Sequence, residues 1–348
     1  MDGIIIGATV RPFRAGDEAR WDAFVSGCED GTFFHLSGWK RVIERAFGHR
    51  THFLLCERGG AVTGVLPLTH VKSRLFGSSL ISNAFGVHGG PVASDIESLR
   101  LLEDEAVRLM ETQAVPVLEL RGFSTTRSDW PSRSDLYVNF ARPIDSSIEK
   151  NLKMIPRKQR AMIRKAQGNH LESSVDSDID RLYRIYSESV RNLGTPVFGR
   201  SYFRILQEEF ADCCDIVTVT SNGEAVASVL NFYFKDQVLP YYGGGTAGAR
   251  ALAANDFLYW EVMRRACERG YRLFDFGRSK LGTGSYAFKH NWGFEAKPLT
   301  YQFRLAAGRE MPNLNPLNPK FDLFVNLWKR LPLTVAEVLG PPIVKGIG

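Results

Sequence analysis

Residues 60–68 read Gly-Ala-Val-Thr-Gly-Val-Leu-Pro-Leu, and residues 224–232 read Glu-Ala-Val-Ala-Ser-Val-Leu-Asn-Phe. Four positions are identical at one offset: Ala61 and Ala225, Val62 and Val226, Val65 and Val229, Leu66 and Leu230. Each stretch follows a turn that contains glycine, at residues 58–60 and at residues 221–224. Each stretch therefore predicts a β-hairpin, with one strand before the turn and one after it.

The same elements follow each hairpin in the same order. A glycine step comes first, at His88–Pro91 and at Tyr242–Gly245. Apolar residues at helical spacing come next: Leu101, Leu102, Ala106, Leu109 and Met110 in one copy, Leu258, Val262, Met263 and Ala266 in the other. Strands at Val115–Leu120 and Arg272–Phe276 then follow. The shared order indicates a duplicated α+β unit with a glycine-broken strand in each copy.

The repeat sets the expected domain boundaries. We expect lobe one at residues 8–143, ending in a short strand at Leu136–Phe140, and lobe two at residues 148–306. Residues 307–348 combine a Pro- and Asn-rich linker with an amphipathic tail. A chain of 348 residues is also long enough for two domains.

The composition excludes several protein classes. Hydrophobic residues make up 44% and charged residues 24%, with a net charge of +6, as in ordinary globular proteins. There is no run of 18 apolar residues and no recognisable export signal. Five scattered cysteines without a CxxC motif favour the reducing cytoplasm, and we expect no metal site. Hydrolase, Walker and dinucleotide-binding motifs are absent from the sequence.

Residues 275–294 carry the clearest chemical signal, because one lysine stands among aromatic residues. Lys289 lies near Tyr286, Phe288 and Trp292, after a strand that ends in Asp275-Phe-Gly. A partly desolvated ammonium could stabilise the oxyanion that develops in acyl transfer. A surface lysine lying over an aromatic patch is the other interpretation.

A second segment, Lys150–Lys165, contains seven positive residues and no acid. Pro156 and Gly168 suit the two ends of a helix, on which Arg157, Arg160 and Arg164 form one stripe. Such a stripe could bind phosphate groups of a nucleotide-linked substrate, a lipid pyrophosphate or tRNA, or it could be a solvated helix face. No DNA-reading motif accompanies it, so we expect no DNA partner.

The C-terminal tail also allows two interpretations. Its apolar residues share one face of a short helix that Pro332, Pro341 and Pro342 are expected to interrupt; they are Phe321, Phe324, Val325, Trp328 and Leu331. That face could pack against a lobe, or it could lie on an anionic membrane surface.

At these residues the chain resembles the FemAB family, the tandem-GNAT aminoacyltransferases of peptidoglycan cross-bridge synthesis. Within that family it resembles more closely the FemAB-like proteins associated with the PEP-CTERM/exosortase system. The resemblance covers nearly the whole chain and rests on these segments: Phe34–Trp39, residues 89–91, Arg160–Ala166, Tyr241–Gly245, residues 275–277, residues 284–293 and the tail from Leu331 to Lys345.

The resemblance implies an α+β fold of two tandem GNAT-like lobes, with mixed sheets flanked by helices. It implies an N-acyltransferase with no tightly bound cofactor, whose donor is an aminoacyl-tRNA or an acyl-CoA. The acceptor would be an amine on a phosphate-bearing small molecule or a lipid-linked precursor of peptidoglycan, exopolysaccharide or another cell-envelope polymer. The enzyme would be cytoplasmic, with peripheral contact at the inner membrane as a further expectation.

The resemblance implies that Lys289 is the active-site lysine. Backbone N–H groups near Gly243–Gly245 would help it to stabilise the oxyanion, and Asp275 and His290 are candidates for the base because they lie close to it in the sequence. Tyr286 and Arg278 would position the donor. Together with Arg278, the substrate-binding candidates are Arg157, Arg160, Arg164, Tyr241, Tyr242, Gly243, Gly244 and Trp292.

The sequence departs from the family in three respects. No segment has the length or the heptads of the coiled-coil arm that tRNA-dependent Fem enzymes often carry in lobe two, so we expect no such arm. The nucleotide-contacting lysine of the relatives falls at Ile43, and the acetyl-CoA loop of single GNAT domains has no match. Two other functions therefore stay open: an acyl-CoA- or acyl-carrier-dependent enzyme acting on a soluble amine, and a non-catalytic scaffold at the membrane.

Overall fold

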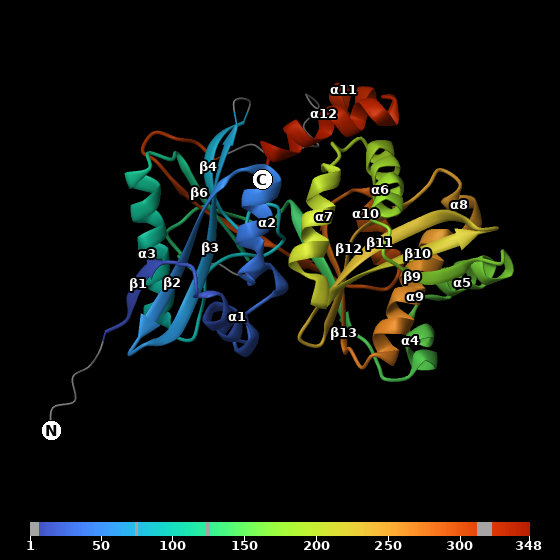
Figure 1. Cartoon of the computed structure of the whole chain (residues 1–348), viewed down its shortest axis with the longest axis horizontal. Coiled ribbons are helices and arrows are strands. Elements are labelled where there is room, and N and C mark those ends of the chain that lie inside the picture. Colours follow the sequence, from blue (N-terminus) through green and yellow to red (C-terminus); the bar gives the residue numbers. More distant parts are fainter. Residues whose placement is uncertain (1–6, 74–75, 123–125, 312–321) are drawn as a thin grey trace. The chain divides into compact units, whose positions relative to one another are not determined.

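The computed structural model describes residues 7–73, 76–122, 126–311 and 322–348. The chain forms two compact units, which can be followed by colour in Figure 1. The first unit comprises Met1–Ser134, Leu299–Asn313 and Lys345–Gly348, and the second comprises Asp135–Pro298 and Leu314–Val344. Each unit contains one mixed sheet flanked by helices.

The sheet of the first unit has the strand order β1-β2-β3-β4-β6-β15-β7, with β5 paired to β3. Its elements are β1 (Thr9–Pro12), α1 (Glu18–Gly27), η1 (Phe33–His35), α2 (Gly38–Phe47), β2 (Arg50–Arg58), β3 (Ala61–Ser73), β4 (Gly77–Ser82), β5 (Val92–Ala93), α3 (Ile96–Thr112), β6 (Val117–Gly122), β7 (Ser132–Arg133) and β15 (Thr300–Leu305).

The sheet of the second unit has the strand order β14-β8-β13-β12-β11-β10-β9. Its elements are β8 (Tyr137–Pro143), α4 (Ile148–Met154), α5 (Arg157–Gly168), β9 (Glu172–Asp176), α6 (Ile179–Leu193), α7 (Arg200–Glu209), η2 (Ala211–Cys213), β10 (Cys214–Ser221), β11 (Glu224–Phe234), β12 (Gln237–Gly245), α8 (Ala249–Leu252), α9 (Ala254–Glu268), β13 (Leu273–Lys280), α10 (Gly284–Asn291), β14 (Ala296–Pro298), α11 (Asp322–Trp328) and α12 (Leu333–Lys345).

Both predicted hairpins are confirmed, as β2–β3 and β10–β11. Their two-residue turns have positive φ at both positions, 58° and 82° at Gly59 and Gly60, and 52° and 80° at Asn222 and Gly223. Two successive positive φ values define the type I′ turn that matches the twist of a hairpin. The predicted helices after the hairpins are α3 and α9, so the repeated order of elements is also confirmed.

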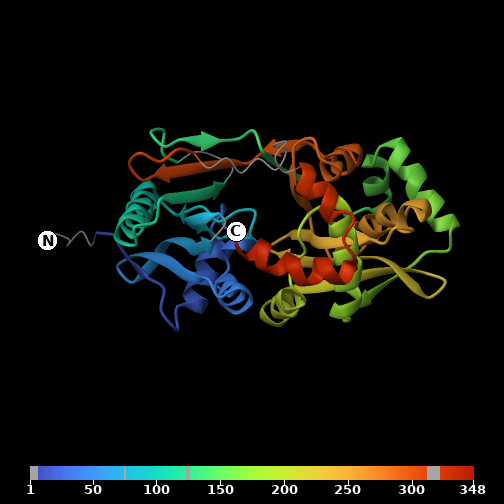
Figure 2. The same ribbon diagram turned by 90° about the horizontal axis from the view of Figure 1, so that it is seen from above.

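The sheets differ from the expected boundaries, because each is completed by a strand from elsewhere in the sequence. The strand expected to end lobe one is β8, and it pairs with β13 and β14 in the second unit. The last strand within the range expected for lobe two is β15, which lies between β6 and β7 of the first unit (Figure 2). A boundary at residue 143 would separate β8 from the sheet to which it is hydrogen-bonded.

Each sheet contains one short parallel pair. β4 pairs with β6 only at Leu80↔Leu118 and Ile81↔Glu119, and β12 pairs with β13 only at Gln237↔Leu273 and Val238↔Phe274. In the first unit the expected glycine-broken strand is an irregular segment after β4. The N–H groups of Gly89 and Gly90 donate to the carbonyl of Arg121 on β6, at 3.3 and 2.8 Å. This segment therefore fills the gap where β4 and β6 separate.

The tail packs on the second unit. Val325 of α11 lies against Gly194, and Gly340 of α12 brings its backbone against Val197. α12 was expected to be interrupted at Pro341 and Pro342, but it continues through both to Lys345. Phe321 and most of the expected linker lie outside the described residues.

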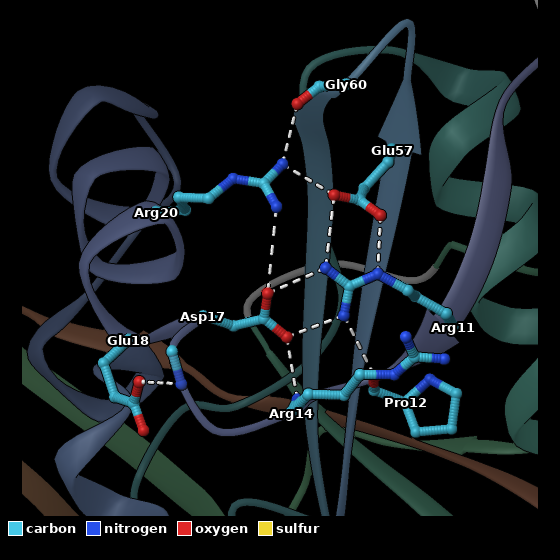
Figure 3. Close-up of polar contacts among 9 residues, drawn as sticks. Arg11, Pro12, Arg14, Asp17, Glu18, Arg20, Glu57 and Gly60 are labelled. Carbon is cyan, nitrogen blue, oxygen red and sulfur yellow. Dashed lines mark hydrogen bonds and ion pairs between the residues drawn. The ribbon is translucent and has the colours of Figure 1, made fainter.

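A network of ions ties β1, α1 and β2 together in the first unit (Figure 3). The Arg11 guanidinium donates two hydrogen bonds to Asp17, at 2.6 and 2.7 Å, and its Nε donates to Glu57 at 2.6 Å. Hydrogen bonding from Arg11 lowers the pKa of Asp17 to about 2. The folded state therefore gains stability above the ordinary pKa of Asp17, and that gain is lost as the pH falls from about 4 to 2.

We expect Arg11→Met to lower the free energy of unfolding by about 2 kcal/mol at pH 7, because two carboxylates lose their main cation. The loss should shrink as the pH is lowered toward 3. Urea unfolding at both pH values measures it. Arg14→Met is the control, because the exposed Arg14 contacts Asp17 through its backbone N–H. Equal effects of both substitutions would contradict this account.

Candidate functional site

The candidate site starts from a bulge in β13. The register between β13 and β8 shifts between Asp275 and Gly277. Gly277 has φ +72°, in the left-handed region that glycine tolerates best, and its N–H donates to the Asp275 carboxylate at 2.8 Å. The bulge turns two backbone carbonyls, those of Gly277 and Arg278, toward α10.

Lys289 reaches these carbonyls from the last turn of α10. Its ammonium donates to the carbonyl oxygens of Gly277 and Arg278, both at 3.0 Å. Burial lowers the pKa of Lys289 to about 7, the charge of Arg278 adds to this, and the Asp275 carboxylate opposes it. A lysine ammonium has three N–H donors, so one is left without a partner among the described residues. The Lys289 side chain is half-buried, and its ammonium is bound to backbone carbonyls as well as lying near an aromatic ring.

Asp275 lies behind the bulge rather than at a surface. Its side chain is buried, and one oxygen accepts hydrogen bonds from the Gly277 N–H and from Asn139 Nδ2 of β8, the latter at 2.9 Å. Burial raises the pKa of Asp275, while these hydrogen bonds and the charge of Lys289 lower it. These contacts suit a residue that fixes the bulge and supports the lysine.

Aromatic side chains surround the ammonium. Lys289 Nζ lies 6.0 Å from the ring centroid of Phe140, and Tyr286 packs edge-on against Phe140 with centroids 5.4 Å apart. His290 is exposed and stacks on Tyr286. Tyr241 and Arg278 belong to the same neighbourhood: the Tyr241 ring borders Gly277, and Arg278 lies over the ring of Tyr137.

Three predicted site residues lie elsewhere. The hydroxyl of buried Tyr242 is 2.6 Å from that of Tyr202 on α7. Gly243 and Gly244 are paired with β11, and a Cβ at Gly244 would meet Ser189 at 2.3 Å. These glycines therefore permit close packing of β12 within the unit. The irregularity in the pairing of β12 with β11 lies before the glycines, where Leu230 pairs with Tyr242 and Asn231 pairs with Pro240.

Trp292 is fully buried, and its indole N–H donates to Asp256 near the start of α9, at 3.1 Å. Burial raises the pKa of Asp256 to about 6, against the hydrogen bond from Trp292. Trp292 is thus part of the core beneath the site rather than of its surface.

The predicted basic helix is confirmed as α5, with Arg157 and Arg164 exposed and Arg160 half-buried. Its start adjoins the end of α10: a Cβ at Gly293 would lie 3.0 Å from the Pro156 ring. Among the described residues, no chain of hydrogen bonds links Arg157, Arg160 or Arg164 to the Lys289 ammonium.

Sequence reasoning missed the residues of β8. Asn139 and Phe140 support Asp275 and Lys289, as described above. Arg142 stacks on Phe294 at 4.4 Å, burial lowers its pKa, and its Nε and Nη2 atoms have no hydrogen-bond partner among the described residues. The strand itself was predicted at Leu136–Phe140, but it was assigned to the first lobe, so its pairing with β13 was missed.

Residues 150–290 match the family model described as the acetyltransferase (GNAT) domain. The matched residues lie within the second unit. The match includes α5, the splayed β12–β13 pair and α10 as far as His290. A comparison with the curated proteins gave no match.

Several solved structures share the fold across both units. The crystal structure of FemX has a TM-score of 0.66 and 16% identity, covering 84% of this chain and 96% of that chain. A domain of a putative lysylphosphatidylglycerol synthetase from Agrobacterium fabrum has a TM-score of 0.57 and 13% identity, covering 84% and 93%. A tandem GNAT protein from the clavulanic acid biosynthesis pathway has a TM-score of 0.53 and 12% identity, covering 87% and 100%.

These likenesses confirm the predicted fold class, two tandem GNAT-like units with mixed sheets flanked by helices. The longest helix in the described ranges is α3, with 17 residues, so no coiled-coil arm is present there. A GNAT domain supports an acyltransferase that uses an acyl-CoA-type co-substrate and no tightly bound cofactor.

We expect Asp256→Asn to stabilise the protein more at pH 7 than at pH 4. The raised pKa means that the folded state holds the neutral acid more tightly, so wild-type stability falls as the pH rises from about 4 to 6. An amide still accepts the Trp292 hydrogen bond but does not ionise. The stability gap between variant and wild type should widen by about 2 kcal/mol over this range in urea unfolding. A gap independent of pH would refute this assignment.

Proposed function

We propose that the second unit catalyses N-acyl transfer, with the Lys289 ammonium stabilising the tetrahedral oxyanion. The observation that carries this proposal is the ammonium fixed at the β13 bulge, with two N–H groups bound to backbone carbonyls. These two hydrogen bonds also fix the direction in which the third N–H group points. A donor oriented before the reaction stabilises developing negative charge without reorganisation.

Asp275 is a positioning residue in this proposal. It is too buried to meet an incoming amine, and it keeps the bulge and the lysine charge in place. Tyr286 and Arg278 border the ammonium and position the donor. His290, exposed on the next residue of α10, is the candidate that can take a proton from the attacking amine.

The acceptor is an amine on a molecule that carries phosphate. Arg157 and Arg164 offer exposed guanidinium groups, and Arg142 and Arg160 add donors that lack internal partners. Arginine binds phosphate oxygens through paired N–H donors. In line with the exosortase-associated group that the chain resembles, we place the reaction on a lipid-linked or nucleotide-linked cell-envelope or exopolysaccharide precursor.

The donor is an aminoacyl-tRNA in our first proposal and an acyl-CoA in the second. FemX and the lysylphosphatidylglycerol synthetase domain share the fold, which supports the first by analogy only. The acyl-CoA alternative rests on the GNAT domain match. Both use the same lysine.

The test is transfer of a labelled acyl group from each donor class to nucleotide- and lipid-linked amines. Lys289→Met should lower kcat by about 10²- to 10³-fold while the folded state, followed by thermal unfolding, persists. Lys297→Met is the matched control, since Lys297 is an exposed lysine of the same unit on β14. Activity of Lys289→Met within a few-fold of wild type would sink the proposal and favour the scaffold function.

The pH profile separates a charged lysine from a neutral one. If the ammonium is the active form, the rate should fall as the pH rises through about 7, where Lys289 loses its proton. Lys289→Arg should lose this alkaline decline, because a guanidinium stays charged. A rate that rises through pH 7 and depends on Lys289 would instead make the neutral amine a base.

A further inference from the structure

The two tail helices bury one apolar face each within the second unit. On α11, Trp328 is 3% exposed and Val325 lies over Gly194. On α12, the buried face consists of Ala336, Gly340 and Val344, with the glycine backbone against Val197. Figure 1 shows both helices beside α6. Of the apolar face expected on the first tail helix, Val325 and Trp328 pack against the unit, whereas Phe324 is exposed.

The outward faces of the same helices are also apolar. Leu323, Phe324 and Leu327 of α11 are 69%, 39% and 57% exposed. Val335, Val338 and Leu339 of α12 are 37%, 71% and 48% exposed. We call these six residues the tail patch. A helix on a protein surface normally turns polar residues outward, so apolar residues on both faces indicate a second contact.

The two tail helices and their connection carry a small net positive charge. From Asp322 to Lys345 there are three cations, Lys329, Arg330 and Lys345, and two acids, Asp322 and Glu337. Lys329 and Arg330 directly follow α11, are exposed and have no ion pair with another described residue. Glu337 is half-buried. The patch thus combines exposed aliphatic side chains with two unpaired cations.

We propose that the tail patch docks on an anionic lipid membrane, with its apolar side chains in the interfacial region and Lys329 and Arg330 at the headgroups. Apolar insertion together with cation attraction is the standard basis of peripheral binding. Aliphatic side chains enter lipid without needing a shaped pocket, which a protein partner would have to supply. This docking goes beyond the transfer reaction and does not depend on it.

The tail lies along the membrane rather than through it. α12 has 13 residues, which span about 20 Å as a helix, less than the roughly 30 Å hydrocarbon core. Among the described residues no helix combines the length and apolarity that crossing a bilayer requires.

The test is co-sedimentation of the full chain with vesicles of phosphatidylcholine alone and of phosphatidylcholine with phosphatidylglycerol. Wild type should bind the anionic vesicles, and binding should weaken with salt. The double variant Val338→Glu/Leu339→Glu should bind at least about tenfold more weakly. Ile96→Glu is the matched control: Ile96 is an exposed apolar residue of α3 in the first unit, 64% exposed, and its substitution should change nothing.

A second variant, Lys329→Glu/Arg330→Glu, should lose the preference for anionic vesicles. Undiminished binding by both double variants, or no binding by wild type, would overturn the docking proposal. Concentration-dependent dimerisation without lipid, removed by Val338→Glu/Leu339→Glu, would assign the patch to a second copy of the chain instead. Transfer to a water-soluble acceptor should be unchanged in both variants, so a failure here is distinct from a failure of the transfer proposal.

Discussion

The antiparallel pairing of β8 with β13 holds the candidate site together. β8 supplies Asn139, which binds the Asp275 carboxylate, and Phe140, which packs beside the Lys289 ammonium. The register shift between these strands produces the bulge whose carbonyls accept from Lys289. Without β8, β13 would be an edge strand along its length, and nothing would fix the direction in which those carbonyls point.

The two units show what that register shift adds, because the first unit lacks it. There β15 pairs with β6 in an unbroken ladder from Thr300↔Gly122 to Leu305↔Val117. On β6 a buried ion pair joins Glu119 and Arg121 at 2.7 Å, and Gly89 and Gly90 close the gap beside β4. The duplication thus kept the strand order in both units, and the bulge with its lysine is a feature of the second unit.

Local sequence was sufficient for the two hairpins and for α3, α5 and α9, because each depends on residues close together in the chain. The turn at Asn222-Gly223 is of this kind. The exchange of β8 and β15 depends on pairing between distant segments, which hydrophobic pattern does not encode. The same limit explains why Tyr242 and Trp292 were predicted to bind substrate. Both are aromatic residues next to a motif, and only their contacts with α7 and α9 show that they lie in the core.

The environment of Lys289 carries an energetic argument about its role. Burial disfavours its charge, as the lowered pKa shows, and a lysine at the surface would avoid this cost. The fold nevertheless directs the ammonium at two carbonyls and places the buried Asp275 near it, although burial also disfavours that carboxylate. Packing alone would be served better by apolar residues of similar size. Two ionisable groups with displaced pKa values around a glycine bulge are more typical of sites shaped by chemistry than of sites shaped by stability. The fixed carbonyls of the bulge and the desolvation of the lysine therefore support the proposal of a donor that is oriented before its substrate arrives.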